Sequence, residues 1–322
     1  MFAAYAILIL VLLALGALTV VAVVAVMAIA LLRPPRMTDG KAVWVLKRLS
    51  PSDLGLEFHE HHFNIRDEQT GRPMRLAGWW MPHPEAEGRC VVLLHGYADA
   101  KVGAIAWAPL WHAMKFNILA IDLRAHGESD GKNMTAGFWE RHDVGQVLDQ
   151  LRREKPGETR EMILFGVSLG AATAAATAAM RSDLSAVVLE SPPADFRAAP
   201  MSHMEHLGAP SRFFQGLALT LAERLADCDF GAVRPADMVK KIPCPVLIIA
   251  PDGDPMASES DRRQMREAIQ SRHREDDVYW PVTAGHVLAL HAEPQAYEQK
   301  LVRFVAAAVQ YRITCPGSSL AV

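Results

Sequence analysis

The stretch Met162–Met180, with the sequence MILFGVSLGAATAAATAAM, decides how this chain folds. Its first residues, Met162–Phe165, form a short apolar run that is typical of a strand buried on both faces. The run leads directly into Gly166–Gly170 (GVSLG), and small residues then continue to Met180. A G-x-S-x-G pentapeptide between a strand and a helix predicts a sharp turn that raises the Ser168 hydroxyl above the sheet.

The residues around Ser168 suit such a turn. Gly166 and Gly170 stand two positions to either side, where crowding of the backbone requires residues without a side chain. The alanine-rich helix that follows can approach the sheet closely, and its positive N-terminal end favours a developing negative charge. Ser168 is therefore the candidate nucleophile; the alternative is a tight turn with an idle serine.

Strand-like and helix-like stretches alternate along most of the chain. The buried strands are expected at Cys90–Leu94, Asn117–Ile121, Met162–Phe165, Ala186–Leu189, Pro245–Ala250 and Val278–Val282. The helices are expected at about Gly103–Lys115, Ala136–Glu154, Leu169–Arg181, Ser258–Gln270 and Pro294–Gln310. This alternation predicts right-handed βαβ units and a mostly parallel sheet flanked by helices. Leu56–Ile65 alternates apolar and polar residues and predicts an antiparallel edge strand that pairs with Arg75–Met81.

One interval lacks a strand pattern. It lies between Glu190 and Pro245 and contains Phe213–Leu225, which has the pattern of an amphipathic helix. The interval is the natural place for a small helical lid at residues 194–240, over the carboxyl edge of the sheet. The alternative is a helix packed on the sheet and joined by long loops.

The first thirty residues form a separate segment. No charged residue occurs from Phe2 to Leu32, and a membrane-spanning helix needs about 20 apolar residues. We therefore expect a transmembrane anchor at residues 1–32; a cleaved signal peptide, the alternative, would have a basic start and a shorter apolar core. Basic residues follow the span at Arg33, Arg36, Lys41, Lys47 and Arg48. By the positive-inside rule they predict that the rest of the chain lies on the cytoplasmic side.

The overall composition narrows the class of protein. The net charge of −3, from 33 basic and 36 acidic residues, argues against a nucleic-acid partner, which usually binds a clustered basic face. Apolar residues make up 51% of the chain, enough for a sizeable core. The cysteines Cys90, Cys228, Cys244 and Cys315 form no CxxC pair, so unpaired thiols are expected in place of a zinc site. The oligomeric state is not predicted.

Beyond the serine motif, the chain resembles the α/β-hydrolase family over roughly Leu76–Val309. It is most similar to single-domain serine hydrolases that carry one N-terminal membrane anchor. The resemblance rests on Val91–Tyr97 (VVLLHGY), Ala120–Ser129 (AIDLRAHGES), the turn around Ser168, and Gly285–His286 with the Asp254 region upstream. The order and spacing of these segments are more specific than any one of them.

A serine hydroxyl needs a histidine base that is oriented by a carboxylate, and in this fold the chain order is Ser, acid, His. The resemblance implies His286 as the base, with His291 as the alternative. It implies Asp254 as the acid, a few residues beyond a buried strand. Asp252 and Glu190 are the rivals, because Ala250–Pro251 stands where His–Gly is common in the family.

The resemblance also implies the donors that stabilise a developing oxyanion. They are the backbone N–H groups of Tyr97 and Leu169. His95 is expected to shape its loop, with a catalytic role as the alternative, and Asp122–Ser129 is expected to brace the site. His59–His62 (HEHH) is not expected to bind a metal, because alternate residues of a strand face opposite ways.

Together these features predict an α/β-hydrolase fold with a small helical lid, preceded by one transmembrane helix. The expected divisions are an anchor at 1–32, a juxtamembrane linker at 33–54, a hydrolase domain at 55–314 and a tail at 315–322. The expected activity is cleavage of an ester or related acyl bond in a small or lipid-like acyl substrate, through an acyl-enzyme on Ser168, without a metal or organic cofactor. The alternatives are a peptidase, thioesterase or acyltransferase of the same fold, and a catalytically silent, membrane-tethered binding module.

Overall fold

An eight-stranded sheet forms the centre of the protein in a computed structural model that describes residues 2–197 and 212–314. The strands are β1 His59–Arg66, β2 Pro73–Met81, β3 Arg89–Leu94, β4 Asn117–Ile121, β5 Glu161–Val167, β6 Ala186–Glu190, β7 Val246–Pro251 and β8 Val278–Val282. Their spatial order is β1-β2-β4-β3-β5-β6-β7-β8. β2 pairs antiparallel with both β1 and β4, and the remaining pairs are parallel. The predicted sheet is confirmed, including its antiparallel edge.

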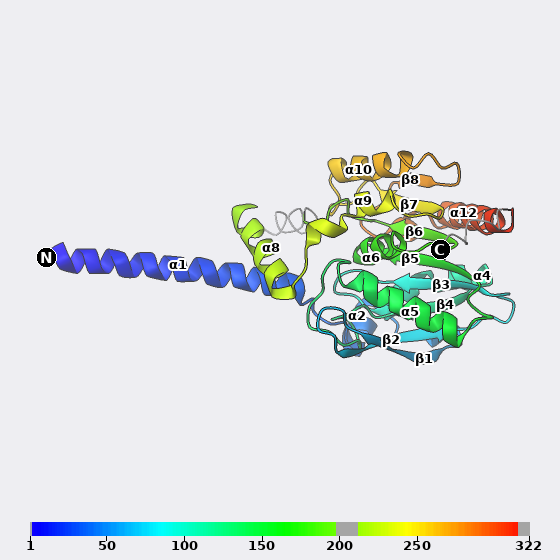
Figure 1. The fold of residues 1–322 in the computed structure, drawn as a ribbon, viewed down its shortest axis with the longest axis horizontal. Coiled ribbons are helices and arrows are strands. Elements are labelled where there is room, and N and C mark those ends of the chain that lie inside the picture. The colour runs from blue at the N-terminus through cyan, green and yellow to red at the C-terminus, as the bar shows by residue number, and fades with distance from the viewer. Residues whose placement is uncertain (1, 198–211, 315–322) are drawn as a thin grey trace.

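Helices cover both faces of this sheet (Figure 1). The helices of the described residues are α1 Phe2–Leu32, α2 Asp39–Leu46, α3 Lys101–Ala104, α4 Ala108–Ala113, α5 Glu140–Glu154, α6 Leu169–Ala178, α8 Arg212–Ala226, α9 Pro235–Val239, α10 Glu259–Gln270, α11 Ala289–Ala292 and α12 Pro294–Thr314, with short turns η1 Pro51–Leu54, η2 Ile105–Trp107 and η3 Phe230–Val233. The alternation of side chains along a strand divides the core in two. In β3, Cys90, Val92 and Leu94 pack in the core that includes α5 and α6. Val91 and Leu93 pack in the core that includes α4 and α12.

Two predicted helices differ from the structure, and the backbone explains both differences. The helix expected at Gly103–Lys115 is divided into α3, η2 and α4, with Pro109 in the first turn of α4. Proline suits this position because it has no N–H to donate to the preceding turn. The helix expected from Ala136 begins only at Glu140, since Ala136 and Gly137 have φ angles of 56° and 97°, outside the helical region.

The segment expected as a linker, residues 33–54, is partly helical. It contains α2, whose first turn is capped by the Thr38 hydroxyl, which accepts a hydrogen bond from the Lys41 N–H. It also contains η1, which begins with Pro51. The Ser–Pro and Thr–Asp pairs before these turns are the local signals for them.

The N-terminal helix α1 projects from the domain as one long apolar rod (Figure 1). It is long and apolar enough to cross a membrane, and its most apolar window is only 6% buried. The exception is its last third, where Val24, Ala28 and Leu32 are buried in the same core cluster as α8. These residues recur every four positions, so one stripe of α1 faces the domain.

The predicted lid interval, residues 194–240, contains α8, η3 and α9. Residues 198–211 within it lie outside the described residues. The amphipathic helix expected at Phe213–Leu225 is present as α8, and it packs beside the end of α1 (Figure 1). The expected tail, 315–322, also lies outside the described residues.

Candidate active site

Ser168 lies at the junction of β5 and α6, in a strained turn. Its backbone angles, φ 53° and ψ −115°, are ones that residues other than glycine seldom adopt. The flanking glycines make the turn possible. A Cβ atom at Gly166 would overlap the carbonyl group of Gly170, and one at Gly170 would overlap the carbonyl oxygen of Leu94. The Ser168 N–H donates to the carbonyl oxygen of Glu190 at 2.9 Å, which ties the turn to β6.

His286 lies in the loop between β8 and α11 and contacts Ser168 directly. Its Nε2 atom is 2.9 Å from the Ser168 Oγ, and its Nδ1 atom is 2.7 Å from the Oδ2 of Asp254. The next residue, Val287, has a φ of 56°, an unfavourable angle for a β-branched side chain. Its N–H donates to the Ser191 hydroxyl at 3.0 Å, which helps to hold the loop in this conformation.

Asp254 is the acid that the structure brings to the histidine. Its side chain is fully buried, and its Oδ1 accepts the Met256 N–H at 2.8 Å, so the carboxylate is fixed from both sides. Gly253 beside it donates its N–H across to the β8–α11 loop at 3.1 Å. Asp252 points elsewhere, with its Oδ2 3.5 Å from the Thr283 hydroxyl.

The remaining alternatives lie apart from this chain of hydrogen bonds. Glu190 is buried, and its Oε2 accepts hydrogen bonds from the Trp107 indole at 3.1 Å and from the Tyr297 hydroxyl at 2.7 Å. Burial raises the pKa of Glu190 to about 7, against the opposing effect of these donors. His291 is exposed on α11, and it is His286 that reaches the serine.

The two expected oxyanion donors flank Ser168. Leu169 is the first residue of α6, so its N–H is one of the donors that have no partner within the helix. Tyr97 follows Gly96, and a Cβ atom at Gly96 would be in ordinary contact with the Ser168 Cβ at 3.6 Å. The loop after β3 therefore lies against the serine turn, as an oxyanion site requires.

The loop after β3 is held by buried polar groups. His95 Nδ1 is 2.7 Å from the Gly96 carbonyl oxygen, and His95 Nε2 accepts the Leu123 N–H at 3.0 Å. These partners require the neutral ring, in agreement with burial, which holds the pKa of His95 well below its ordinary value. Asp122 accepts a hydrogen bond from the Lys101 ammonium at 2.9 Å, which joins the loop after β4 to the start of α3. His95 and Asp122 thus have the bracing contacts that were expected of them.

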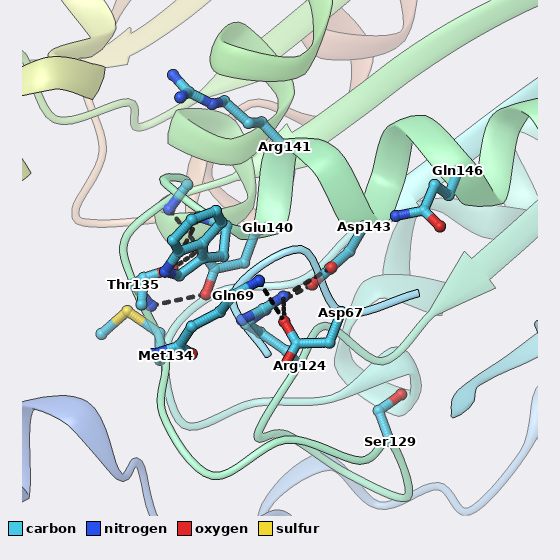
Figure 2. A network of polar contacts seen from close by, with 12 residues as sticks. Asp67, Gln69, Arg124, Ser129, Met134, Thr135, Glu140, Arg141, Asp143 and Gln146 are labelled. Atoms are coloured by element: carbon cyan, nitrogen blue, oxygen red, sulfur yellow. Dashed lines mark hydrogen bonds and ion pairs between the residues drawn. The ribbon is translucent and has the colours of Figure 1, made fainter. Parts of the chain in front are cut away.

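A second network fixes the loop after β4 (Figure 2). Arg124 is paired with Asp143 on α5 at 2.5 and 2.7 Å and with Asp67 at 3.1 Å. Glu140 accepts the N–H and the hydroxyl of Thr135 at 2.7 and 2.6 Å. Burial raises the pKa of Asp143 to about 6, and the neighbouring guanidinium opposes that rise. Because each buried charge has a partner, this network makes a rigid support and leaves no free group for catalysis.

The histidine cluster of β1 has partners other than a metal. His61 Nε2 is 2.9 Å from the Glu154 Oε2, and Glu60 accepts the Trp79 indole N–H at 2.8 Å. Among residues 2–197 and 212–314, no group of three or more His, Cys, Asp or Glu side chains is arranged to hold a metal ion.

Two of the described cysteines, Cys90 and Cys228, are free thiols. Cys244 is buried, and Cys315 lies outside the described residues. Burial raises the pKa of the Cys228 thiol to about 12 and that of Cys90 further still. These thiols are therefore protonated and poorly nucleophilic at neutral pH.

Two contacts beside the site have no counterpart in the sequence predictions. One is the Ser191 hydroxyl, which accepts the Val287 N–H from 96 residues away in the sequence. The other is the Tyr97 hydroxyl, which donates to the carbonyl oxygen of Ala30 in α1 at 2.8 Å. The exposed carbonyls at a helix end are a general signal that partners are needed, but which residues supply them depends on the tertiary fold.

Comparisons with known proteins agree with this fold. Residues 85–229, less than half of the chain, match the family described as serine aminopeptidase, S33. An uncharacterized protein of Mycobacterium tuberculosis is 30% identical over 125 residues, which cover 38% of this chain and 43% of that protein.

Solved structures extend the likeness over most of the chain. An esterase of Pyrococcus furiosus, Pf2001, superposes with a TM-score of 0.68 at 21% identity, over 85% of this chain and 99% of that one. The α/β hydrolase GrgF from Penicillium gives a TM-score of 0.61 at 16% identity, over 79% and 99% of the two chains. With the sheet order and the strained serine turn, these findings show that the chain has the α/β-hydrolase fold.

Proposed function

We propose that this protein is a serine hydrolase that cleaves an ester or related acyl bond through an acyl-enzyme on Ser168. His286 acts as general base and Asp254 orients it. The observation that carries the proposal is the continuous chain of hydrogen bonds from Ser168 Oγ through His286 to Asp254, at 2.9 and 2.7 Å.

The proposed reaction has two halves. In the first, Ser168 Oγ attacks the acyl carbon as its proton passes to His286 Nε2, and the same proton is then given to the leaving group. In the second, His286 takes a proton from water, which attacks the acyl carbon; the bond to Ser168 Oγ breaks, the acid leaves, and His286 returns the proton to Ser168 Oγ. In both halves the negative oxygen lies within reach of the N–H groups of Tyr97 and Leu169. Asp254 holds a proton on His286 Nδ1, so that Nε2 is free to accept one.

A test of this proposal needs no knowledge of the substrate. A fluorophosphonate probe phosphonylates an activated serine, and we expect the full chain to be labelled at Ser168. Ser168→Ala should abolish labelling, whereas Ser52→Ala, which changes an exposed serine of η1, should leave it unchanged. A folded wild-type protein that fails to react would point instead to a catalytically silent binding module.

The kind of acyl bond is part of the proposal. We infer an ester because an apolar helix that can span a membrane lies directly beside the site, where lipid-like acyl compounds are concentrated. The family match favours peptide-bond cleavage as the second candidate. Matched p-nitrophenyl ester, thioester and aminoacyl anilide substrates, compared by kcat/KM, distinguish these activities, and a preference for the anilide would overturn the ester assignment.

We also propose that α1 anchors the protein and that the hydrolase domain lies on the cytoplasmic side. The length of α1 and the basic residues that follow it support this arrangement. In sealed inverted vesicles, added protease should digest the domain, whereas intact cells should protect it. A shortened mature chain that begins after α1 would show instead that the helix is a signal sequence.

A further inference from the structure

Helix α8 has two apolar surfaces, and the residues that the structure describes cover only one of them. Its buried side, formed by Ala218, Leu219, Ala222 and Ala226, belongs to the same core cluster as the end of α1. On its other side Phe213 is 69% exposed and Leu217 is 41% exposed. These two residues are four positions apart and therefore share one face of the helix.

Exposed apolar side chains occur along α8, since Leu225 in its last turn is also 52% exposed. The described charged side chains of the helix, Glu223 and Arg224, lie in its last turn, nearer the domain. Phe213 and Leu217 lie in its first half, which projects beside α1 (Figure 1). A helix that exposes apolar side chains on one face, as Phe213 and Leu217 do here, can lay that face against an apolar medium.

The position along α1 at which α8 packs indicates what that apolar medium is. The buried stripe of α1 begins at Val24, so α8 packs against the last part of the span. The uncovered part, Phe2–Val23, is 22 residues long and extends about 33 Å at 1.5 Å per residue. A hydrocarbon core is about 30 Å thick, so α8 lies at the boundary between the acyl chains and the headgroups.

The attachment of α1 to the domain fixes this arrangement next to the site. The carbonyl oxygens of Ala30 and Leu32, which have no partners within the helix, accept the Tyr97 hydroxyl at 2.8 Å and the Met134 N–H at 2.7 Å. Tyr97 is also an expected oxyanion donor. One tyrosine side chain therefore separates the last turn of the span from the neighbourhood of Ser168.

We propose that the first half of α8 rests in the bilayer boundary beside α1, and that the substrate of Ser168 is a bilayer-resident lipid ester that enters from this side. The occupant of the exposed face is thus lipid, because that face continues the lipid-facing surface of α1. The substrate class rests on the proposed function, whereas the lipid contact of α8 does not.

The lipid contact is tested with an environment-sensitive fluorophore on the full chain in vesicles. Phe213→Cys and Leu217→Cys are labelled with NBD in a background where Cys228 and Cys315 are replaced by serine. Met180→Cys is the matched control, since Met180 is also apolar and is 55% exposed just after the end of α6.

We expect NBD at positions 213 and 217 to be blue-shifted and quenched by doxyl-labelled lipid, and NBD at position 180 to be quenched by aqueous iodide. If iodide quenches the emission at all three positions and doxyl lipid quenches none, α8 lies in water and the proposal is overturned. A blue shift at 213 and 217 without quenching by doxyl lipid would overturn it also, because it would show burial against a second copy of the chain.

The substrate class is tested by the ratio of kcat/KM for a long-chain ester in vesicles to that for a short water-soluble ester. Removing two apolar side chains from the boundary, in Phe213→Ser with Leu217→Ser, should lower this ratio roughly tenfold or more. Met180→Ser should leave the ratio unchanged. An unchanged ratio in the double variant would overturn entry from the bilayer, whereas failure of the proposed function would appear separately, as the absence of fluorophosphonate labelling in the wild type.

Discussion

Replacing Asp254 with asparagine tests the proposed acid without changing its size. Oδ1 of the side chain accepts the Met256 N–H at 2.8 Å, so the new amide keeps its oxygen there and turns its NH2 toward His286 Nδ1. Two N–H groups cannot face each other, so the imidazole must carry its proton on Nε2 instead. That nitrogen lies 2.9 Å from Ser168 Oγ and can then no longer accept the serine proton.

The magnitude follows from the loss of the reactive tautomer. A wrong tautomer in a Ser-His-Asp arrangement costs on the order of 10³ to 10⁴ in rate, which is about 4 to 5.5 kcal/mol of activation free energy. Asp252→Asn is the matched control, because it makes the same chemical change two residues earlier in the same loop. The Asp252 carboxylate has only a weak contact, at 3.5 Å, with the Thr283 hydroxyl. Its replacement should therefore lower the rate less than about threefold.

The assay is the second-order rate constant of fluorophosphonate labelling, with thermal unfolding of each variant to confirm that it is folded. The assignment of the acid is refuted when Asp252→Asn slows labelling more than Asp254→Asn does. Retention of more than about a tenth of the rate in Asp254→Asn, with loss in Glu190→Gln, would move the acid to β6.

Three other substitutions probe the support of the site. Gly170→Ala should destabilise the fold by about 3 kcal/mol or lose it, since the new Cβ meets the Leu94 carbonyl; a normal thermal midpoint would contradict this packing. Glu190 has its pKa raised from 4.5 to about 7, so the stability it contributes is full below pH 4.5 and is lost as the pH rises through 7, a change of about 3 kcal/mol. Glu190→Gln should therefore flatten the pH dependence of the unfolding free energy in this window, and an unchanged slope would contradict the raised pKa. Tyr97→Phe removes the bond to Ala30 and should lower the thermal midpoint by about 2 °C in detergent, an effect that Tyr5→Phe in the exposed span should not reproduce.

The fold was predictable because its signals are local and repeat along the chain. Each parallel strand is an apolar run, and period-two alternation marks the exposed edge strand β1. Helix limits were less predictable where the backbone leaves the usual angles. Ala136 gives no sign in its side chain that its φ is 56°, because that angle is imposed by the surrounding contacts of the loop after β4.

The proposed site was predictable to the extent that its chemistry lies in short motifs. Gly166–Gly170 identifies the serine, and the structure brings His286 and Asp254 to it in the expected order along the chain. Their catalytic roles stay predictions. Ser191 could not be found in this way, because its hydroxyl reaches Val287 across 96 residues of sequence and belongs to no motif.

The contact between α1 and the site was not predictable from the sequence either, because it too depends on the tertiary fold. An apolar span of this kind predicts a tether, and a tether would leave the last carbonyls of the helix to water. Instead Tyr97 and Met134 take two of them. Arg36 then donates to four backbone oxygens between His126 and Gly131, at 2.6 to 3.3 Å.

These contacts join the end of the span to the loops after both β3 and β4, on the side of the sheet where Ser168 stands. The distance between Ser168 and the end of α1 is therefore set by packing and hydrogen bonds, and so would be its distance from the bilayer in the proposed arrangement. Changes within Phe2–Val23 should shift the depth of the anchor and leave the site intact. A longer connection at Pro34–Pro35, by contrast, would separate Arg36 from the helix end that it helps to dock, and with it the site from the proposed membrane entrance.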